Sequence, residues 1–189
     1  IDPGVVVKFN SADGQGSGVD SNRIELIMEG TLVATGTQSE PIQFYYSTPT
    51  ATNKGSWYGV RVTTTGTATI SHSVLRNTTY AIYSQGTTSL TDVEIAYGSS
   101  YGVYIASGKM TILRANIHHQ SSYGVHASNG TTIINESTIS YNSNSGVYHS
   151  NGIIKMFANL IYRNSSYGVY IRTTSSTADA SLDHNTIAY

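Results

Sequence analysis

A short phrase recurs along this chain at a nearly constant spacing. "SSYGVYI" occupies residues 99–105, "SSYGVHA" occupies 121–127, and "SSYGVYI" returns unchanged at 165–171. Aligned on Tyr-Gly-Val, the repeat begins at Tyr58, Tyr80, Tyr101, Tyr123, Ser145 and Tyr167. Four of the five steps are 22 residues long and one is 21. Such a repeat predicts a solenoid, because one unit alone cannot bury its apolar side and must stack on its neighbours.

Inside each unit, apolar and polar residues alternate between turns of Gly, Asn and Ser. A strand opens at Gly-Val, as in Val103 and Ile105. The second apolar position is Ile70, Leu90, Ile112, Ile133, Ile154 or Leu182, and the third is Val74, Ile95, Ile117, Ile139, Ile161 or Ile187. Alternation with a period of two predicts strands, and the unit is too short for a strand–helix–strand crossover of about 30 residues. Each unit should therefore be one coil of three short strands.

Residues 1–56 lack the phrase but contain strand-like segments at 5–9, 24–28, 31–35 and 42–46. We therefore predict an all-β, single-stranded parallel β-helix of about eight coils of about 22 residues. One domain would span residues 1–189, with irregular N-terminal coils over 1–56 and six regular coils over 57–189, the last incomplete. The chain stops at "LDHNTIAY", in the middle of a coil. An open solenoid end exposes backbone donors and acceptors, so we expect end-to-end contact with further coils, a domain or a subunit.

The segments "PGVVVKF", "GTLVATGTQSEPIQF" and "GSWYGVRV", followed by the 22-residue units, resemble right-handed, pectate-lyase-like β-helix proteins of microbial surfaces. The resemblance covers essentially the whole chain, and it implies a right-handed coil and an extracellular or cell-surface location. It is specific for the fold rather than for an activity. This fold carries polysaccharide lyases, glycoside hydrolases, adhesins, phage tailspikes and non-catalytic surface domains.

The low charge excludes several classes of partner. Charged residues make up 11% of the chain and the net charge is −1, against roughly 25% charged residues in an average soluble protein. We therefore expect no nucleic-acid partner, which would require a basic surface. Membrane insertion is not expected either, because no apolar run reaches the roughly 18 residues of a membrane span.

Catalytic members of the resembled family carry acidic residues on the outward face of stacked strands, as calcium ligands in lyases or as acid–base pairs in hydrolases. The outward position of the Gly-Val strand instead reads Arg61, Tyr83, Tyr104, His126, Tyr148 and Tyr170. The nearest approach to a catalytic cluster is a file predicted at His72, Asp92, Arg114, Asn135, Met156 and His184. A ladder of opposite charges would have the same composition. The sequence favours a non-catalytic protein and leaves an enzyme open.

Two further groups of residues were considered as ligand or modification sites. Asp13 and Asp20 lie among glycines in the loop 10–22, where oxygen ligands could hold Ca²⁺, although a plain surface loop has the same composition. No other metal or cofactor is expected, and His118 and His119 should point to opposite sides of a strand. Glycosylation sequons occur at Asn77, Asn129, Asn135 and Asn164, as often as chance predicts in a chain this rich in Asn, Ser and Thr.

Tyrosine supplies 15 of the aromatic residues, beside one Trp and three Phe, and it falls into files. One file is the outward Gly-Val position, a second is the first motif position, and a third, before the Asn corner, reads Arg76, Tyr97, His119, Tyr141, Arg163 and Tyr189. Tyr rings beside Asn, Ser and Thr suit sugars, which present apolar C–H faces and polar rims. The predicted carbohydrate-binding residues are Tyr83, Tyr104, His126, Tyr148, Tyr170, Tyr97, His119, Tyr141 and Arg163. Stacking for stability alone is the alternative.

These observations favour a structural or adhesive segment of a larger extracellular surface protein, with a polysaccharide or cell-surface glycan as its ligand and end-to-end self-assembly as its packing mode. A carbohydrate-active enzyme, either a polysaccharide lyase or a glycoside hydrolase, is the alternative, and its active coils could also lie beyond Tyr189.

Overall fold

The computed structural model describes residues 1–173, 176 and 178–189, which form strands β1 to β20 and turns. The strands are β1 Val6–Phe9, β2 Glu25–Met28, β3 Thr31–Thr35, β4 Ile42–Tyr46, β5 Gly59–Val62, β6 Thr67–Arg76, β7 Ile82–Ser84, β8 Thr87–Ala96, β9 Val103–Ile105, β10 Lys109–Leu113, β11 Asn116–His118, β12 Val125–Ala127, β13 Thr131–Asn135, β14 Thr138–Ser140, β15 Val147–His149, β16 Ile153–Phe157, β17 Leu160–Tyr162, β18 Val169–Ile171, β19 Asp179–Asp183 and β20 Thr186–Ala188. Among the described residues, no helix is long and apolar enough to cross a membrane.

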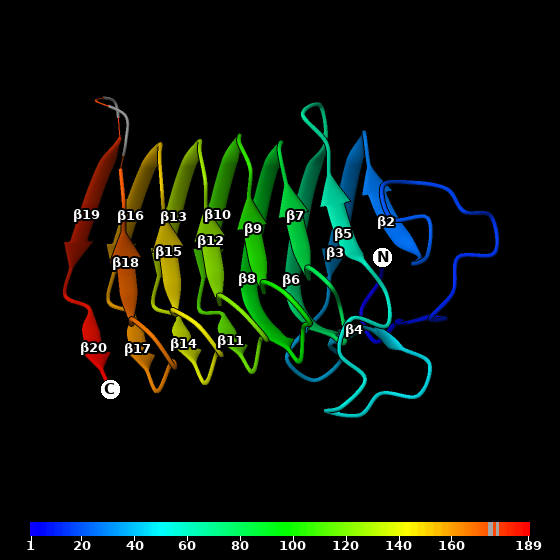
Figure 1. The fold of residues 1–189 in the computed structure, drawn as a ribbon. Coiled ribbons are helices and arrows are strands. Elements are labelled where there is room, and N and C mark those ends of the chain that lie inside the picture. The colour runs from blue at the N-terminus through cyan, green and yellow to red at the C-terminus, as the bar shows by residue number, and fades with distance from the viewer. Residues whose placement is uncertain (174–175, 177) are drawn as a thin grey trace.

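The strands pile up as coils along one axis, with the N-terminal coils at one end and β18 to β20 at the other (Figure 1). One sheet is seven-stranded, in the order β18-β15-β12-β9-β7-β5-β2, and we call it the front sheet. The other sheet has 13 strands, because the long strands β6 and β8 turn a corner and each belongs to two faces of the coil. Every pairing in both sheets is parallel, as in β12 with β15 and β10 with β13.

The predicted parallel β-helix is confirmed. Seven stacked strands in the front sheet correspond to six full turns from first to last, slightly fewer than the eight coils expected. The difference comes from residues 1–56, where β1 pairs with β4 while β3 and β4 both pair with β6. This segment therefore supplies one complete coil, β2 to β4, with the single strand β1 beyond it.

Apolar side chains line the inside of the coil in files that follow the strand register. In the front sheet Val103, Val125 and Val147 are paired in succession and have no exposed surface. Two of the inward files predicted from the sequence contain errors. The second file continues from Ile112 to Ile134 and Met156 rather than to Ile133 and Ile154, and Leu75 rather than Val74 pairs with Ile95.

Turns of unequal length explain the error at Val74 only, because the register from β10 to β13 and from β13 to β16 is a constant 22 residues and leads directly from Ile112 to Ile134 and Met156. Four residues separate Val62 from Thr67, two separate Ser84 from Thr87, and three separate Ile105 from Lys109. The register from β6 to β8 is consequently 20 residues, whereas the register from β8 to β10 is 22. A constant offset from the Tyr-Gly-Val motif therefore misses the true neighbour by one or two residues.

Two corners of each coil are made by a single residue with a left-handed backbone. The first corner has φ between 44° and 55° at His72, Asp92, Arg114, Glu136, Ala158 and His184. The second corner has φ between 51° and 65° at Asn77, Tyr97, His119, Tyr141 and Arg163. This conformation costs about 1 kcal/mol or more for a residue with a side chain. The chain turns there within one residue.

At the predicted Asn corner, side-chain amides on successive coils form a ladder of hydrogen bonds inside the coil. Gln120 accepts a hydrogen bond from the Gly98 N–H at 2.9 Å, and Asn142 accepts one from the Gln120 N–H at 3.0 Å. Asn164 accepts the next from the Asn142 N–H at 3.1 Å. Each side chain thus satisfies a backbone donor that the corner leaves without a strand partner.

Candidate functional site

The predicted file of outward residues on the front sheet is formed. Tyr83 pairs with Tyr104, Tyr104 with His126, His126 with Tyr148, and Tyr148 with Tyr170. Successive ring centroids along this file lie 5.1, 4.9, 4.7 and 5.3 Å apart. Below it, the Arg61 guanidinium lies 5.8 Å from the centre of the Tyr83 ring. The parallel backbone ladder therefore places one planar side chain on each coil.

The tyrosines of the first motif position merge with this file. Tyr101 contacts Tyr80, Tyr104 and Tyr123, with ring centroids 5.3–5.6 Å apart. Where Ser145 replaces the motif tyrosine, Tyr148 lies against Tyr123 at 5.1 Å and 21° between the ring planes. The two predicted files thus form one continuous surface, the aromatic face, made of Tyr80, Tyr83, Tyr101, Tyr104, Tyr123, His126, Tyr148, Tyr167 and Tyr170.

Most of the aromatic face is partly buried, whereas Tyr167 and Tyr170 at its C-terminal end are exposed. Burial raises the pKa of Tyr83 and of Tyr101, so both hydroxyls stay protonated. Burial also lowers the pKa of His126 to about 4, so its imidazole is neutral. The Ser128 hydroxyl lies 3.3 Å from both the Tyr104 hydroxyl and His126 Nε2. The face thus combines aromatic rings with neutral hydroxyl and imidazole groups.

The third predicted file lies at the second corner. His119 stacks on Tyr141 with ring centroids 5.3 Å apart and planes 9° apart, and Tyr97 lies 5.3 Å from His119. Arg163 covers Tyr141 at 5.6 Å, and its Nη1 donates a hydrogen bond to the Tyr141 hydroxyl. Arg76 does not belong to this file as predicted, because it pairs with Ala96 rather than with Tyr97. Its guanidinium nevertheless reaches within 6.0 Å of the Tyr97 ring centre.

His118 and His119 do not point to opposite sides as predicted. Their Nδ1 atoms lie 2.7 Å apart, because the left-handed φ of 56° at His119 turns its side chain to the same side. This distance is that of a hydrogen bond between two imidazoles. The structure contains no group of three or more His, Cys, Asp or Glu arranged to hold a metal ion within the described part of the chain.

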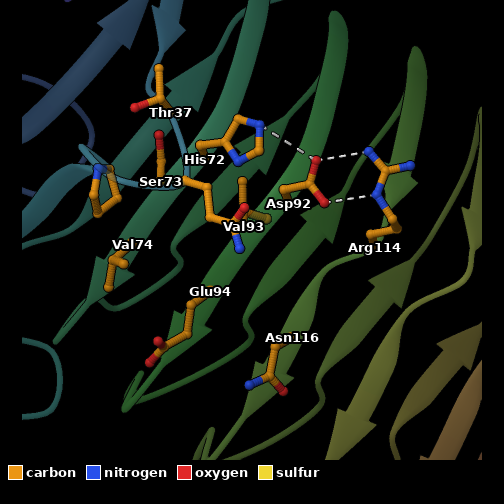
Figure 2. Close-up of a pocket in the computed structure, with 11 residues that line it drawn as sticks. Thr37, His72, Ser73, Val74, Asp92, Val93, Glu94, Arg114 and Asn116 are labelled. Carbon is orange, nitrogen blue, oxygen red and sulfur yellow. Dashed lines mark hydrogen bonds and ion pairs between the residues drawn. The ribbon is translucent and has the colours of Figure 1, made fainter. Parts of the chain in front are cut away.

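The charged file at the first corner is partly as predicted. His72, Asp92 and Arg114 do lie on consecutive coils (Figure 2). Arg114 donates two hydrogen bonds of 2.7 Å to Asp92, and His72 Nε2 lies 3.7 Å from the same carboxylate. Register places Glu136 and Ala158 in this file instead of Asn135 and Met156. The file therefore alternates base and acid from His72 to Glu136.

A second carboxylate, which the sequence analysis did not single out, lies two residues farther along β8. Glu94 accepts hydrogen bonds from Arg76 Nε at 3.1 Å and Nη2 at 2.6 Å, and His118 Nε2 lies 3.5 Å away. Its position just before the inward Ile95 is the sequence signal that predicts an outward side chain. Figure 2 shows Glu94 and Asn116 beside the His72–Asp92–Arg114 row, around one hollow.

Both carboxylates are ionised across the neutral range. The Arg114 hydrogen bonds hold the pKa of Asp92 below its usual value. His118, with Arg76, does the same for the pKa of Glu94. A general acid requires a carboxyl group that keeps its proton near the working pH, and neither Asp92 nor Glu94 meets this condition.

The loop predicted as a calcium site uses its carboxylates internally. Asp13 accepts hydrogen bonds from the Gln15 and Ser17 N–H groups at 2.9 and 2.8 Å. Asp20 accepts from the Asn22 N–H at 2.9 Å and pairs with Arg23 at 2.7 Å. The two side chains serve different turns, and calcium binding at Asp13 and Asp20 stays a prediction.

Two of the four sequons are closed to modification in the folded chain. The Asn77 side chain is 1% exposed and donates to the Thr50 carbonyl at 2.7 Å. Asn164 is 5% exposed and donates to the Ile139 carbonyl at 3.0 Å. The amide nitrogen that would carry a glycan is thus engaged inside the coil at Asn77 and Asn164, whereas Asn129 is exposed and Asn135 is only partly buried.

Comparison with known proteins supports this architecture. The model of a family described as "Right handed beta helix region" matches residues 58–188, which is more than half of the chain. Comparison with curated proteins and with solved structures gave no match. The family match begins at the first Tyr-Gly-Val unit and ends within β20. The chain therefore belongs to the right-handed β-helix family.

Proposed function

We propose that this chain is a non-catalytic β-helix segment of an extracellular surface protein, and that it binds polysaccharide on its aromatic face. One observation carries the proposal: planar side chains stand outward on six consecutive coils of the front sheet, from Arg61 to Tyr170, in unbroken register. The backbone ladder holds them in place before any ligand arrives, so binding would require little ordering of side chains.

The chemistry of this surface matches that of a sugar chain. A sugar ring presents C–H groups that pack on aromatic faces and hydroxyl groups that need hydrogen-bond partners. The aromatic face supplies both, since its rings are partly exposed and the hydroxyls of Tyr104 and Ser128 lie among them. A polymer that contacts several coils would also gain from binding many weak sites at once.

The ion pairs of Asp92 and Glu94 support a binding role over acid–base catalysis by these two carboxylates. Asp92 and Glu94 are the outward carboxylates of β8, and both are held ionised by Arg and His partners. A carbohydrate-active enzyme is the second candidate. Release of reducing ends or unsaturated uronides from polysaccharide by the purified chain would establish it in place of the binding role.

Replacing the aromatic face should abolish binding to insoluble polysaccharide. The test variant is Tyr104→Ala/Tyr148→Ala/Tyr170→Ala, measured by pull-down on cellulose, chitin, xylan and mannan. We expect it to lose most of the wild-type retention, because three ring contacts of about 0.5–1.5 kcal/mol each are removed. The circular dichroism spectrum should be unchanged, since these side chains point away from the core.

The matched control alters three outward residues on the other sheet. Thr111, Ile133 and Lys155 are paired in register on β10, β13 and β16, as the tyrosines are on the front sheet. Thr111→Ala/Ile133→Ala/Lys155→Ala should bind as the wild type does. Equal retention of the tyrosine variant and this control would refute the role of the aromatic face. The location at the cell surface and the end-to-end contact are separate proposals, which this binding experiment does not test.

A further inference from the structure

A groove runs along the outer side of β4, β6, β8 and β11, away from the aromatic face. It consists of three adjoining hollows of about 470, 320 and 220 Å³. Pro41 and Val74 line both the first and the second hollow, while Pro49 and Arg76 line both the second and the third. These shared residues place the three hollows next to one another, and we call the row of hollows the side groove.

Segments outside the regular repeat form the walls of the side groove. Residues 36–41 are anchored by the Gly36 N–H, which donates to the Ser71 carbonyl at 3.0 Å. A side chain at Gly36 would stand 2.4 Å from the His72 carbonyl oxygen, so only glycine allows this close approach. Residues 47–53 are anchored by the hydrogen bond from Asn77 to Thr50. The walls are therefore held by the coils beneath them.

The floor of the side groove is charged but balanced. Arg114 neutralises Asp92, and Arg76 neutralises Glu94. Each pair keeps an unused polar atom, because the described residues make no hydrogen bond to Arg114 Nη1 or to Glu94 Oε2. Asn116 adds an exposed amide to the same floor. The floor thus offers donors and acceptors without a net charge.

The geometry points to the side groove as a second binding site, one that takes a neutral oligosaccharide. Sugar hydroxyls act as donor and acceptor together, and they match the mixed polar atoms around Glu94, Arg114 and Asn116. Tyr45 and Tyr97 in the walls provide aromatic surface for the C–H groups of the sugar. A charged ligand would meet a like charge from one partner of each ion pair, so a neutral ligand fits best.

The site is independent of the proposed function, and one experiment separates the two. Backbone amide NMR spectra of the whole chain would be recorded with cellohexaose, xylohexaose and mannohexaose as neutral probes. Hexagalacturonate and the chitosan hexamer serve as anionic and cationic probes. We expect a neutral probe to shift the amides of residues 36–41, 72–76 and 92–97 and to saturate at millimolar concentration.

Two variants in the groove should weaken this binding. Glu94→Gln and Asn116→Ala each remove polar atoms from the floor, and together they should raise the dissociation constant about tenfold or more. Asn116→Ala is also tested alone, because removal of an exposed side chain should not unfold the chain. The matched controls are Glu136→Gln and Thr138→Ala, one coil farther along, where Thr138 pairs with Asn116. These controls should leave the dissociation constant unchanged.

The remaining outcomes decide between the side groove and the aromatic face. Shifts confined to the aromatic face would exclude the side groove and leave the proposed function in place. Saturable shifts in the groove that survive the tyrosine triple variant would support this site, even if the pull-down failed. Preference for a charged probe, or no shift with any neutral probe, would show that the groove does not bind neutral sugars.

Discussion

At the scale of single residues, two histidines couple this fold to pH. His126 lies among the rings of the aromatic face, and burial lowers its pKa to about 4. His149 is fully buried inside the coil, and burial lowers its pKa as well. The unfolded chain would protonate both near the ordinary histidine value of about 6.5. Between these values the unfolded state binds more protons, so acid favours unfolding.

Acid should therefore destabilise the wild type more than His126→Gln. The contribution of His126 is complete above about pH 6.5 and is lost as the pH falls toward 4. We expect the free energy of unfolding to fall by on the order of 1–3 kcal/mol from this residue alone over that interval, because the partial exposure of the imidazole weakens the effect. Urea unfolding at pH 7.5 and at pH 4.5 would measure it. Parallel losses in wild type and variant would show that His126 does not titrate as inferred.

At the scale of the elements, the second corner depends on its interior amide ladder. The Asn142 side chain accepts from the Gln120 N–H and donates to Asn164 Oδ1 at 2.9 Å. Asn142→Ala leaves the Gln120 N–H buried without this partner, so we expect a loss of about 1–3 kcal/mol in the free energy of unfolding. Urea denaturation would measure this loss.

Asn144→Ala is the comparison within the same corner. The Asn144 side chain is only partly buried, and it accepts a hydrogen bond from the neighbouring Ser145 N–H at 2.9 Å. Its replacement should destabilise the chain by less than Asn142→Ala does. A loss of equal size at both positions would mean that the ladder contributes no more than an ordinary surface turn.

The same corners show how far the sequence could predict this structure. The 22-residue period predicted the coils and the outward file from Tyr83 to Tyr170, because parallel pairing brings equivalent residues together. It failed where turn lengths vary, since Leu75 rather than Val74 pairs with Ile95 across the 20-residue register from β6 to β8. It also failed at His119, where a left-handed backbone reversed the alternation of a strand.

The side groove could not be predicted from the sequence, for a different reason. Its walls come from residues 36–41 and 47–53, which belong to no repeat. Their position over β6 and β8 follows from the pairing of β4 with β6, which no periodicity in residues 1–56 indicates. A repeat predicts contacts between equivalent positions of neighbouring coils. Contacts between a coil and an irregular segment leave no such signal.

At the scale of the whole molecule, neighbouring coils carry nearly all of the stabilising contacts. Each regular strand pairs only with the strands of the coils before and after it, as β12 does with β9 and β15. Stability should therefore be a sum over coils and their interfaces. The interior supports this view, since Val103, Val125 and Val147 on successive coils are the same residue type and are all fully buried.

Removal of one whole coil should consequently leave a folded protein. Deleting residues 123–144 joins Ser122 to Ser145, which occupies the position of Tyr123 in the next coil, so Val147 would pair with Val103 and Tyr148 with Tyr104. We expect an unchanged β-type circular dichroism spectrum and a smaller denaturant m-value, because less surface is exposed on unfolding. Deleting residues 123–133 shortens the coil by half a turn and brings mismatched strands together, so that variant should not fold. If the 22-residue deletion unfolds the chain while single-residue changes in the same coil do not, stability is not additive over coils, and the front sheet acts as one unit.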